Sequence, residues 1–307
     1  AGKTTINFWA GFQGADGDTM KSIVDQFEAD HPEIDVTFYT APWNEMFTKF
    51  GTSHGTPSGP DVVIMHATDI ANFASRKMLT PLDDVATELG IDKANYADPI
   101  WAGNTFDGTQ WGIPLDYHPM GVYKNVELFK AAGIDPEVEF TSREQFLSVA
   151  KQLTSGEQYG IGMGSDYAHT MRYWYGLLYQ AGGEFLNQDN TAAAFNQQPG
   201  VDALQFLSDL VNVDGVAPKL QADIDRDFLA GTTAMVIEGP WFIPTMEESG
   251  MEYTVAPFPT IFGEPGTWAG SHTITIPSGG SDEGRKAAAQ TLVKYLAENS
   301  IPWAKSG

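Results

Sequence analysis

Two acidic residues stand at positions where an acid–base pair would be useful. Asp116 follows Trp111-Gly112-Ile113-Pro114 and Glu238 precedes Gly239-Pro240-Trp241, so both are expected in loops that could face one cleft. Two carboxylates flanking one bond are the machinery of glycoside hydrolysis. Carboxylates also bind sugars without reaction, because they accept hydrogen bonds from hydroxyl groups. Since the chain has 40 Asp and Glu residues, two such positions are also expected by chance.

The motifs of several other chemistries are missing from the sequence. It contains no phosphate-binding glycine loop and no cysteine, and the lack of cysteine excludes disulfides and thiolate sites. No two of its six histidines have the i, i+4 spacing of a helical zinc site. His66 and His118 each follow an expected strand, which leaves metal binding open, but hydrogen bonding in a loop is the simpler interpretation. We expect no cofactor and no metal.

The charge of the chain restricts its partners. Seventeen basic residues against 40 acidic ones give a formal net charge of -23. Nucleic acids need Lys and Arg at their phosphates, and anionic lipids attract basic segments, so neither is expected as a partner. No run of apolar residues approaches the roughly 18 that a membrane-spanning helix needs.

Aromatic residues are abundant and several lie outside apolar faces. The chain has 8 Trp, 11 Tyr and 18 Phe. The apolar C–H faces of sugar rings stack on indole and phenol planes, while short polar side chains bind the hydroxyls. Packing in the core is the alternative for any single ring, but the set favours binding. Five tryptophans neighbour Gly, Pro or an expected strand end: Trp9, Trp43, Trp111, Trp241 and Trp268.

The first part of the chain alternates strands and helices. Strands are expected at residues 4–9, 34–39 and 62–65, with helices between them at about 20–27 and 43–50. Met20, Ile23, Val24 and Phe27 recur with the spacing of one helical face. This order predicts a parallel sheet, whose strand C-terminal ends share one edge. Ligand-binding loops are expected there, at 11–18, Trp43 and 66–69.

The pattern changes after Pro114. A strand is expected at 121–123, followed by a mainly helical region from 141 to about 217, in which Thr141 and Glu144 form a predicted capping box. Further strands are expected at 253–257 and 274–277 and a helix at 283–297. A chain of 307 residues is long for one hydrophobic core and sufficient for two.

Five segments resemble the solute-binding proteins of ABC sugar importers, the maltose-binding-like family 1 group. Each is weak alone, but their order and spacing cover nearly the whole chain. The segments are Gly59-Pro60-Asp61-Val62-Val63; Asp107-Gly108-Thr109-Gln110-Trp111-Gly112-Ile113-Pro114; Tyr123-Lys124-Asn125 through Gly133-Ile134; Phe228-Leu229-Ala230-Gly231-Thr232-Thr233-Ala234-Met235 with Gly239-Pro240-Trp241; and Ala269-Gly270-Ser271-His272.

The resemblance implies a type II-like, two-lobed α/β periplasmic-binding-protein fold with a ligand cleft between the lobes. Lobe 1 would comprise 1–112 plus about 260–307, and lobe 2 about 113–259, with hinges near 112–116 and 257–262. Such receptors usually continue for several helices beyond Gly307, so we expect the usual C-terminal helices of lobe 2 to be lacking, through removal or a shortened variant.

The resemblance also implies the function and the site. The chain would bind a mono- or oligosaccharide, more readily an oligosaccharide, and deliver it to an ABC transporter permease without catalysis. It would act as a monomer outside the cytoplasm, in the periplasm or as a cell-surface lipoprotein. The expected ligand-binding residues are Gly11, Phe12, Gln13, Trp43, His66, Asp69, Asp116, Tyr117, Tyr173, Glu238, Gly239, Trp241, Trp268, Gly270, Ser271 and His272.

Two alternatives stay open. One is a glycoside hydrolase that uses Asp116 and Glu238. The other is a receptor for a different solute, such as an amino acid, a peptide, a polyamine or a metal. A carboxylate-bearing ligand would call for arginine at the site, and among the few arginines of the chain only Arg172 is a candidate.

Overall fold

The computed structural model describes residues 2–164, 167–219 and 221–306, leaving aside the side chains of positions 167 and 168. The chain divides into two compact units. Unit 1 is Ala1–His118 with Gly270–Gly307, and unit 2 is Pro119–Ala269. The predicted lobe boundaries, 112/113 and about 259/260, differ from these. The reason is pairing: Ile113 pairs with Ile274 and the Leu115 amide donates to the His272 carbonyl, which keeps residues 113–118 in unit 1. The Met120 amide donates to the Trp268 carbonyl and the Gln180 side chain to the Gly266 carbonyl, which keeps the segment before Gly270 in unit 2.

Unit 1 is built on a five-stranded sheet of order β2-β1-β3-β13-β6. The first three strands are parallel and β13 runs antiparallel to β3 and β6. The predicted parallel sheet is therefore confirmed and carries an antiparallel addition. The five strands are β1 (Thr4–Ala10), β2 (Ile34–Thr40), β3 (Val62–His66), β6 (Ile113–Pro114) and β13 (His272–Thr275).

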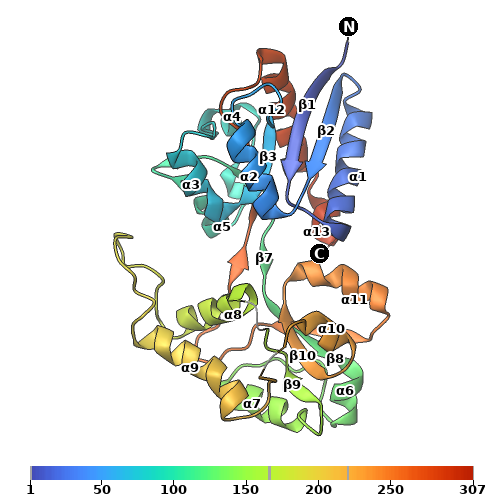
Figure 1. The fold of residues 1–307 in the computed structure, drawn as a ribbon, viewed down its shortest axis with the longest axis vertical. Coiled ribbons are helices and arrows are strands. Elements are labelled where there is room, and N and C mark those ends of the chain that lie inside the picture. Colours follow the sequence, from blue (N-terminus) through green and yellow to red (C-terminus); the bar gives the residue numbers. More distant parts are fainter. Residues whose placement is uncertain (1, 165–166, 220, 307) are drawn as a thin grey trace. The chain divides into compact units, whose positions relative to one another are not determined.

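Alternate residues of these strands serve two apolar layers. Phe8 and Ile64 face the cluster that holds α1 and α12, whereas Trp9 and Met65 face a second cluster on the other side of the sheet. In Figure 1, α12 lies beside β1 near the red end of the chain. The helices of unit 1 are α1 (Gly14–Asp30), α2 (Trp43–Ser53), η1 (Ala67–Asp69), α3 (Ile70–Ser75), α4 (Asp83–Glu88), η2 (Lys93–Asn95), α5 (Asp98–Ala102), α12 (Glu283–Glu298) and α13 (Ile301–Lys305), and β4 (Thr105–Phe106) pairs with β5 (Thr109–Gln110).

Unit 2 is built on a four-stranded sheet of order β11-β8-β10-β9, in which β8 lies antiparallel to β10 and β11. Its central strand β10 is buried along its whole length. The strands are β8 (Gly121–Asn125), β9 (Tyr159–Ile161), β10 (Thr233–Glu238) and β11 (Tyr253–Pro257), and the helices are α6 (Val126–Ala131), α7 (Arg143–Gln152), α8 (Tyr167–Gln180), α9 (Gln198–Asn212), α10 (Ile224–Leu229), η3 (Pro240–Phe242) and α11 (Ile243–Ser249).

The chain passes between the units twice, and the two passing segments pair as β7 (His118–Pro119) and β12 (Ala269–Gly270).

The predicted capping box at Thr141 is wrong by one residue. The N-cap of α7 is Ser142, whose hydroxyl accepts a hydrogen bond from the Gln145 amide. Thr141 lies outside the helix and its own amide donates to the Gln145 side chain at 3.0 Å. Either residue type can cap a helix.

Candidate functional site

The loop after β1 brings one exposed and two buried residues to the carboxyl edge of the unit 1 sheet. Gly11 is buried, and a Cβ there would lie 2.0 Å from the Trp43 ring, so only glycine lets the indole rest on this backbone. Phe12 is 2% exposed and packs against the Trp303 ring. Its predicted role as a direct ligand contact is not supported, because an apolar ring at this strand end gains more from the core. Gln13 is exposed.

Trp43 lies at the same edge within a group of rings. It is partly buried and stacks on His272, with centroids 5.5 Å apart and an angle of 11° between planes. The His66 ring lies 4.3 Å from the indole. Asp69 accepts hydrogen bonds from the His66 amide at 3.1 Å and from His66 Nδ1 at 3.2 Å, so it fixes the turn after β3. We name this surface of Gln13, Trp43, His66 and His272 the unit 1 rim.

The Asp116 carboxylate is hydrogen-bonded to His272, which belongs to the unit 1 rim, and to His118 and Trp303. Its Oδ1 lies 2.7 Å from the His272 amide and 3.1 Å from His118 Nδ1, and its Oδ2 lies 2.5 Å from His272 Nδ1 and 2.8 Å from Trp303 Nε1. Ser271 donates to the Asp116 carbonyl oxygen at 2.7 Å. Every lone-pair position of the carboxylate is thereby occupied.

Burial and hydrogen bonding act in opposite directions on these groups. Burial alone would raise the pKa of Asp116, but the hydrogen bonds and charges of His118 and His272 outweigh it and hold the pKa well below the usual range. Burial lowers the pKa of His272 in spite of its bond to Asp116. Burial, and then the charge of Asp116, raise the pKa of the neighbouring Asp16 to about 6.

Unit 2 presents a second glycine–tryptophan pair. A Cβ on Gly239 would lie 2.1 Å from the Trp241 ring, so the indole again rests on backbone that only glycine allows. The guanidinium carbon of Arg172 lies 5.3 Å from the Trp241 ring centroid and 4.9 Å from that of Trp268. Both indoles are partly buried. We name Arg172, Trp241 and Trp268 the unit 2 rim.

A carboxylate–histidine pair also lies in unit 2. Glu238 is 1% exposed, accepts a hydrogen bond from the Gly239 amide at 3.0 Å and is hydrogen-bonded to His169 Nε2. Burial, followed by the charge of Glu238, raises the pKa of Asp225 to about 7. A negative charge close to a carboxyl group disfavours the ionised form of that group.

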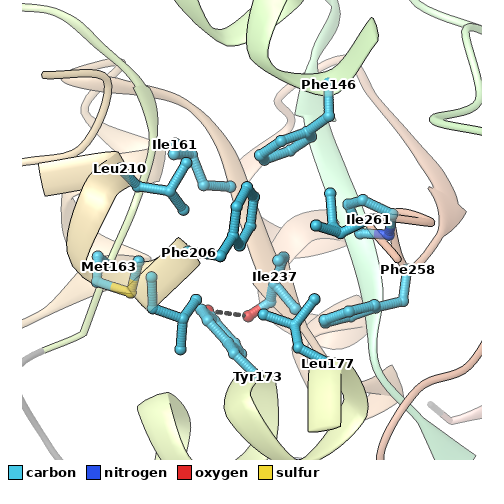
Figure 2. A pocket seen from close by; sticks show the side chains of 12 residues that line it. Phe146, Ile161, Met163, Tyr173, Leu177, Phe206, Leu210, Ile237, Phe258 and Ile261 are labelled. Atoms are coloured by element: carbon cyan, nitrogen blue, oxygen red, sulfur yellow. Dashed lines mark hydrogen bonds between the residues drawn. The ribbon is translucent and has the colours of Figure 1, made fainter. Parts of the chain in front are cut away.

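Tyr173 does not reach a surface. It is 1% exposed, and its hydroxyl donates to the Ile237 carbonyl at 2.6 Å. Figure 2 shows it lining an apolar cavity together with Phe206, Phe258 and Ile261. A volume of about 20 Å³ holds at most one water, and the lining offers it almost no partners, so this cavity is a packing defect rather than a ligand site. The prediction for Tyr173 is corrected accordingly: the helix buries this ring.

The remaining predicted residues lie in the loops and crossing segments. Tyr117 is 55% exposed, whereas Gly270, in β12, is half-buried. Unit 1 also has two larger pockets, of about 830 and 390 Å³. The described residues that line them include none of the predicted site residues.

Sequence reasoning missed several residues. His118 was expected to hydrogen-bond in a loop, with metal binding left open, but its partner, Asp116 Oδ1 at 3.1 Å, was not predicted. His169 and Trp303 meet partners 69 and 187 positions away, and no local pattern predicts such contacts. Arg172 was a candidate only for a carboxylate-bearing ligand, and its contact with Trp241, 69 positions away, was not predicted. In the described ranges, Asp116, His118 and His272 also form a group whose ligand atoms all lie within 4.8 Å of one another.

Comparison with known proteins gives one family. The model of the bacterial extracellular solute-binding proteins matches residues 12–300. A maltotriose-binding protein of Pyrococcus abyssi is 23% identical over 97% of this chain and 63% of its own length. The chain spans about 62% of the length of the first curated relatives it matches.

Solved structures agree on the fold. The GacH receptor of Streptomyces glaucescens, described unliganded and with acarbose, has a TM-score of 0.84 at 24% identity, covering 99% of this chain and 79% of the receptor. UgpB of Mycobacterium tuberculosis, in complex with glycerophosphocholine, has a TM-score of 0.82 at 21% identity, covering 96% and 75%. The predicted α/β periplasmic-binding-protein fold with two lobes is confirmed.

Proposed function

This chain belongs to the family of bacterial extracellular solute-binding proteins, and from that membership we propose that it binds a carbohydrate, an oligosaccharide in preference to a monosaccharide, for an ABC transporter permease. The observation that carries the proposal is the repeated pairing of glycine with tryptophan: Gly11 with Trp43 in unit 1 and Gly239 with Trp241 in unit 2. In each unit an indole is held against backbone, next to hydrogen-bonding groups. This combination suits a sugar ring with its apolar faces and polar edge.

Each unit offers residues for the proposed binding. In unit 1 the rim supplies Gln13, Trp43, His66 and His272, and Tyr117, which follows Asp116 in the sequence, is exposed. In unit 2 the unit 2 rim supplies Trp241 and Trp268. Phe12, Asp69, Asp116, Glu238 and Ser271 have a positioning role in this proposal, because their polar atoms or rings are already engaged within their own unit, and Tyr173 has a structural role alone.

We propose binding without catalysis. A glycosidase needs one carboxyl group to give a proton and another to attack or activate water. Both oxygens of Asp116 already accept two hydrogen bonds each, and Glu238 is 1% exposed and bonded to His169 and Gly239. These engagements support a receptor over a hydrolase. Incubation with oligosaccharides tests this point, and release of shorter sugars would contradict it.

The family also supports a proposal for the cellular location of the protein. The family is described as extracellular. None of the helices in the described ranges is long and apolar enough to span a membrane. We propose that the chain acts outside the cytoplasm as a monomer, in the periplasm or as a cell-surface lipoprotein.

One observation favours a second ligand class. Arg172 lies against both Trp241 and Trp268, where its guanidinium could bind a phosphate group. A phosphate-bearing polyol is therefore the alternative to a neutral sugar. The formal charge of -23 opposes long-range attraction of such an anion, which is why the neutral sugar is preferred.

A thermal-shift screen separates these ligands. A ligand that binds only the folded protein stabilises it by mass action and so raises its melting temperature. At a ligand concentration of a hundred times Kd, the free energy of unfolding increases by about 2.7 kcal/mol. The screen includes maltotriose, acarbose, tagatose, glycerol 3-phosphate, glycerophosphocholine and amino acids. We expect a neutral sugar to give the largest shift. A shift with a phosphate compound alone selects the second class, and a shift with an amino acid alone contradicts both.

A further inference from the structure

We propose that Asp116, His118 and His272 form a binding site for one divalent transition-metal ion, with Zn²⁺ as the best match. The ligand atoms of these three residues lie within 4.8 Å of one another. Two imidazoles and one carboxylate are a donor set that Zn²⁺ accepts, with one position left for water or a further side chain. Two nitrogen ligands disfavour Ca²⁺ and Mg²⁺, which prefer oxygen.

The three side chains converge because of the backbone that carries them. Asp116 and His118 are two residues apart in one segment, and His118 Nδ1 lies 3.1 Å from Asp116 Oδ1. That segment is held against β13 by hydrogen bonds from the Leu115 amide to the His272 carbonyl at 2.8 Å and from the His272 amide to Asp116 at 2.7 Å. A fixed scaffold of this kind lowers the entropic cost of gathering ligands.

The distances need only a small adjustment. His118 Nδ1 and His272 Nδ1 lie 3.1 and 2.5 Å from the two oxygens of Asp116. Zinc ligands at about 2.0–2.1 Å from the ion lie roughly 3.3 Å from one another in a tetrahedron. The ion would enter where ring protons now bridge to the carboxylate, and each neutral ring would carry its proton on Nε2 instead.

Neighbouring groups favour a cation at this place. Asp16 lies within electrostatic reach of Asp116 and His118 and offers a second carboxylate. The ion pairs of the described residues give neither Asp16 nor Asp116 a lysine or an arginine. The Trp303 Nε1 bond to Asp116, at 2.8 Å, would orient the carboxylate from outside, as outer partners do in metal sites.

The test uses the metal alone, without sugar, so that its result is independent of the proposed function. The full chain is stripped with a chelator and titrated with Zn²⁺ by calorimetry and with Co²⁺ by visible absorption. We expect one equivalent bound at micromolar Kd or tighter, with d–d bands typical of low-coordinate Co²⁺. His118→Gln and His272→Gln are expected to weaken binding at least tenfold.

The matched control is His54→Gln. His54 is bonded to Ser278 at 3.0 Å, outside the cluster, and its loss should leave Zn²⁺ affinity unchanged. Absence of binding at millimolar Zn²⁺ overturns the proposal, and so does stoichiometric binding that neither cluster variant weakens. If a variant fails to fold by circular dichroism, X-ray absorption of the zinc-loaded wild type decides: two imidazole ligands support the site, and a shell of oxygen alone overturns it.

Discussion

The two units use the same kinds of residue and reach opposite electrostatic results. In unit 1 a half-buried carboxylate, Asp116, is surrounded by donors that hold its pKa below the usual range. In unit 2, Glu238 has His169 and Gly239 as donors but also faces a second acid, Asp225, whose pKa burial and Glu238 raise to about 7. Whether a carboxyl group in the interior is charged therefore depends on its hydrogen-bond donors and on neighbouring acidic groups, and not on burial alone.

The first prediction removes the charge of Asp116 and has the largest expected effect on stability. Asp116→Asn should lower the free energy of unfolding at pH 7 by about 3 kcal/mol, because one substitution disturbs four hydrogen bonds at a half-buried carboxylate. Since the folded pKa is depressed, the wild type loses this advantage as the pH falls below about 4. Denaturant titrations at several pH values measure it.

The control for this charge change is Asp189→Asn. Asp189 is exposed, so its substitution should change stability by less than about 0.5 kcal/mol. A deficit for Asp116→Asn that stays the same from pH 7 to pH 3 would mean that the charge of Asp116 is not what the fold uses.

The second prediction tests the unit 2 rim. Trp241→Ala should weaken binding of the sugar found in the screen by roughly 1–3 kcal/mol, the scale of losing a packed aromatic contact. Trp174→Phe is the control, because Trp174 packs toward α9 through a bond from its Nε1 to the Gly200 carbonyl. Calorimetric titration gives both dissociation constants, and an unchanged value for Trp241→Ala would remove this residue from the site.

The third prediction separates a structural ring from a binding ring. Tyr173→Phe removes the hydroxyl that donates to the Ile237 carbonyl and should cost about 1 kcal/mol of stability. Because the ring is 1% exposed, sugar affinity should not change. A loss of affinity in the folded variant would restore Tyr173 to the binding residues.

The fourth prediction has the opposite sign to the first and is the smallest. The folded pKa of Asp225 is raised, so the stability it provides is present below its ordinary pKa and is lost as the pH rises toward 7. Asp225→Asn should therefore stabilise the protein by up to about 1 kcal/mol at pH 8, after allowance for solvent screening, and by little at pH 4. Melting temperatures at both pH values test this, with Asp189→Asn again as the reference.

The comparison also indicates what the sequence could predict. The face of α1 formed by Met20, Ile23, Val24 and Phe27 is buried as its spacing predicts, because helical periodicity is a local property. The carboxyl-edge loops of unit 1 followed from the strand order in the same way. The general α/β architecture was therefore within reach.

The details of the site were not within reach, because they depend on distant partners. Asp116 meets His272 156 positions later, and Tyr173 meets Ile237 64 positions later. Whether Phe12 faces a ligand or the core depends on Trp303. A sequence pattern gives the kind of residue at an edge, but long-range packing decides which side chains remain exposed.

The central proposal is that the chain binds a carbohydrate and that Trp43 and Trp241 each contribute to its affinity. The most direct measurement is calorimetric titration of the sugar selected by the screen into the wild type, Trp43→Ala and Trp241→Ala. The account predicts saturable binding to the wild type, no release of shorter sugars, and at least a fivefold loss of affinity in each variant. Unchanged affinity in both folded variants would contradict it, and so would the absence of binding by every sugar while a non-sugar solute binds.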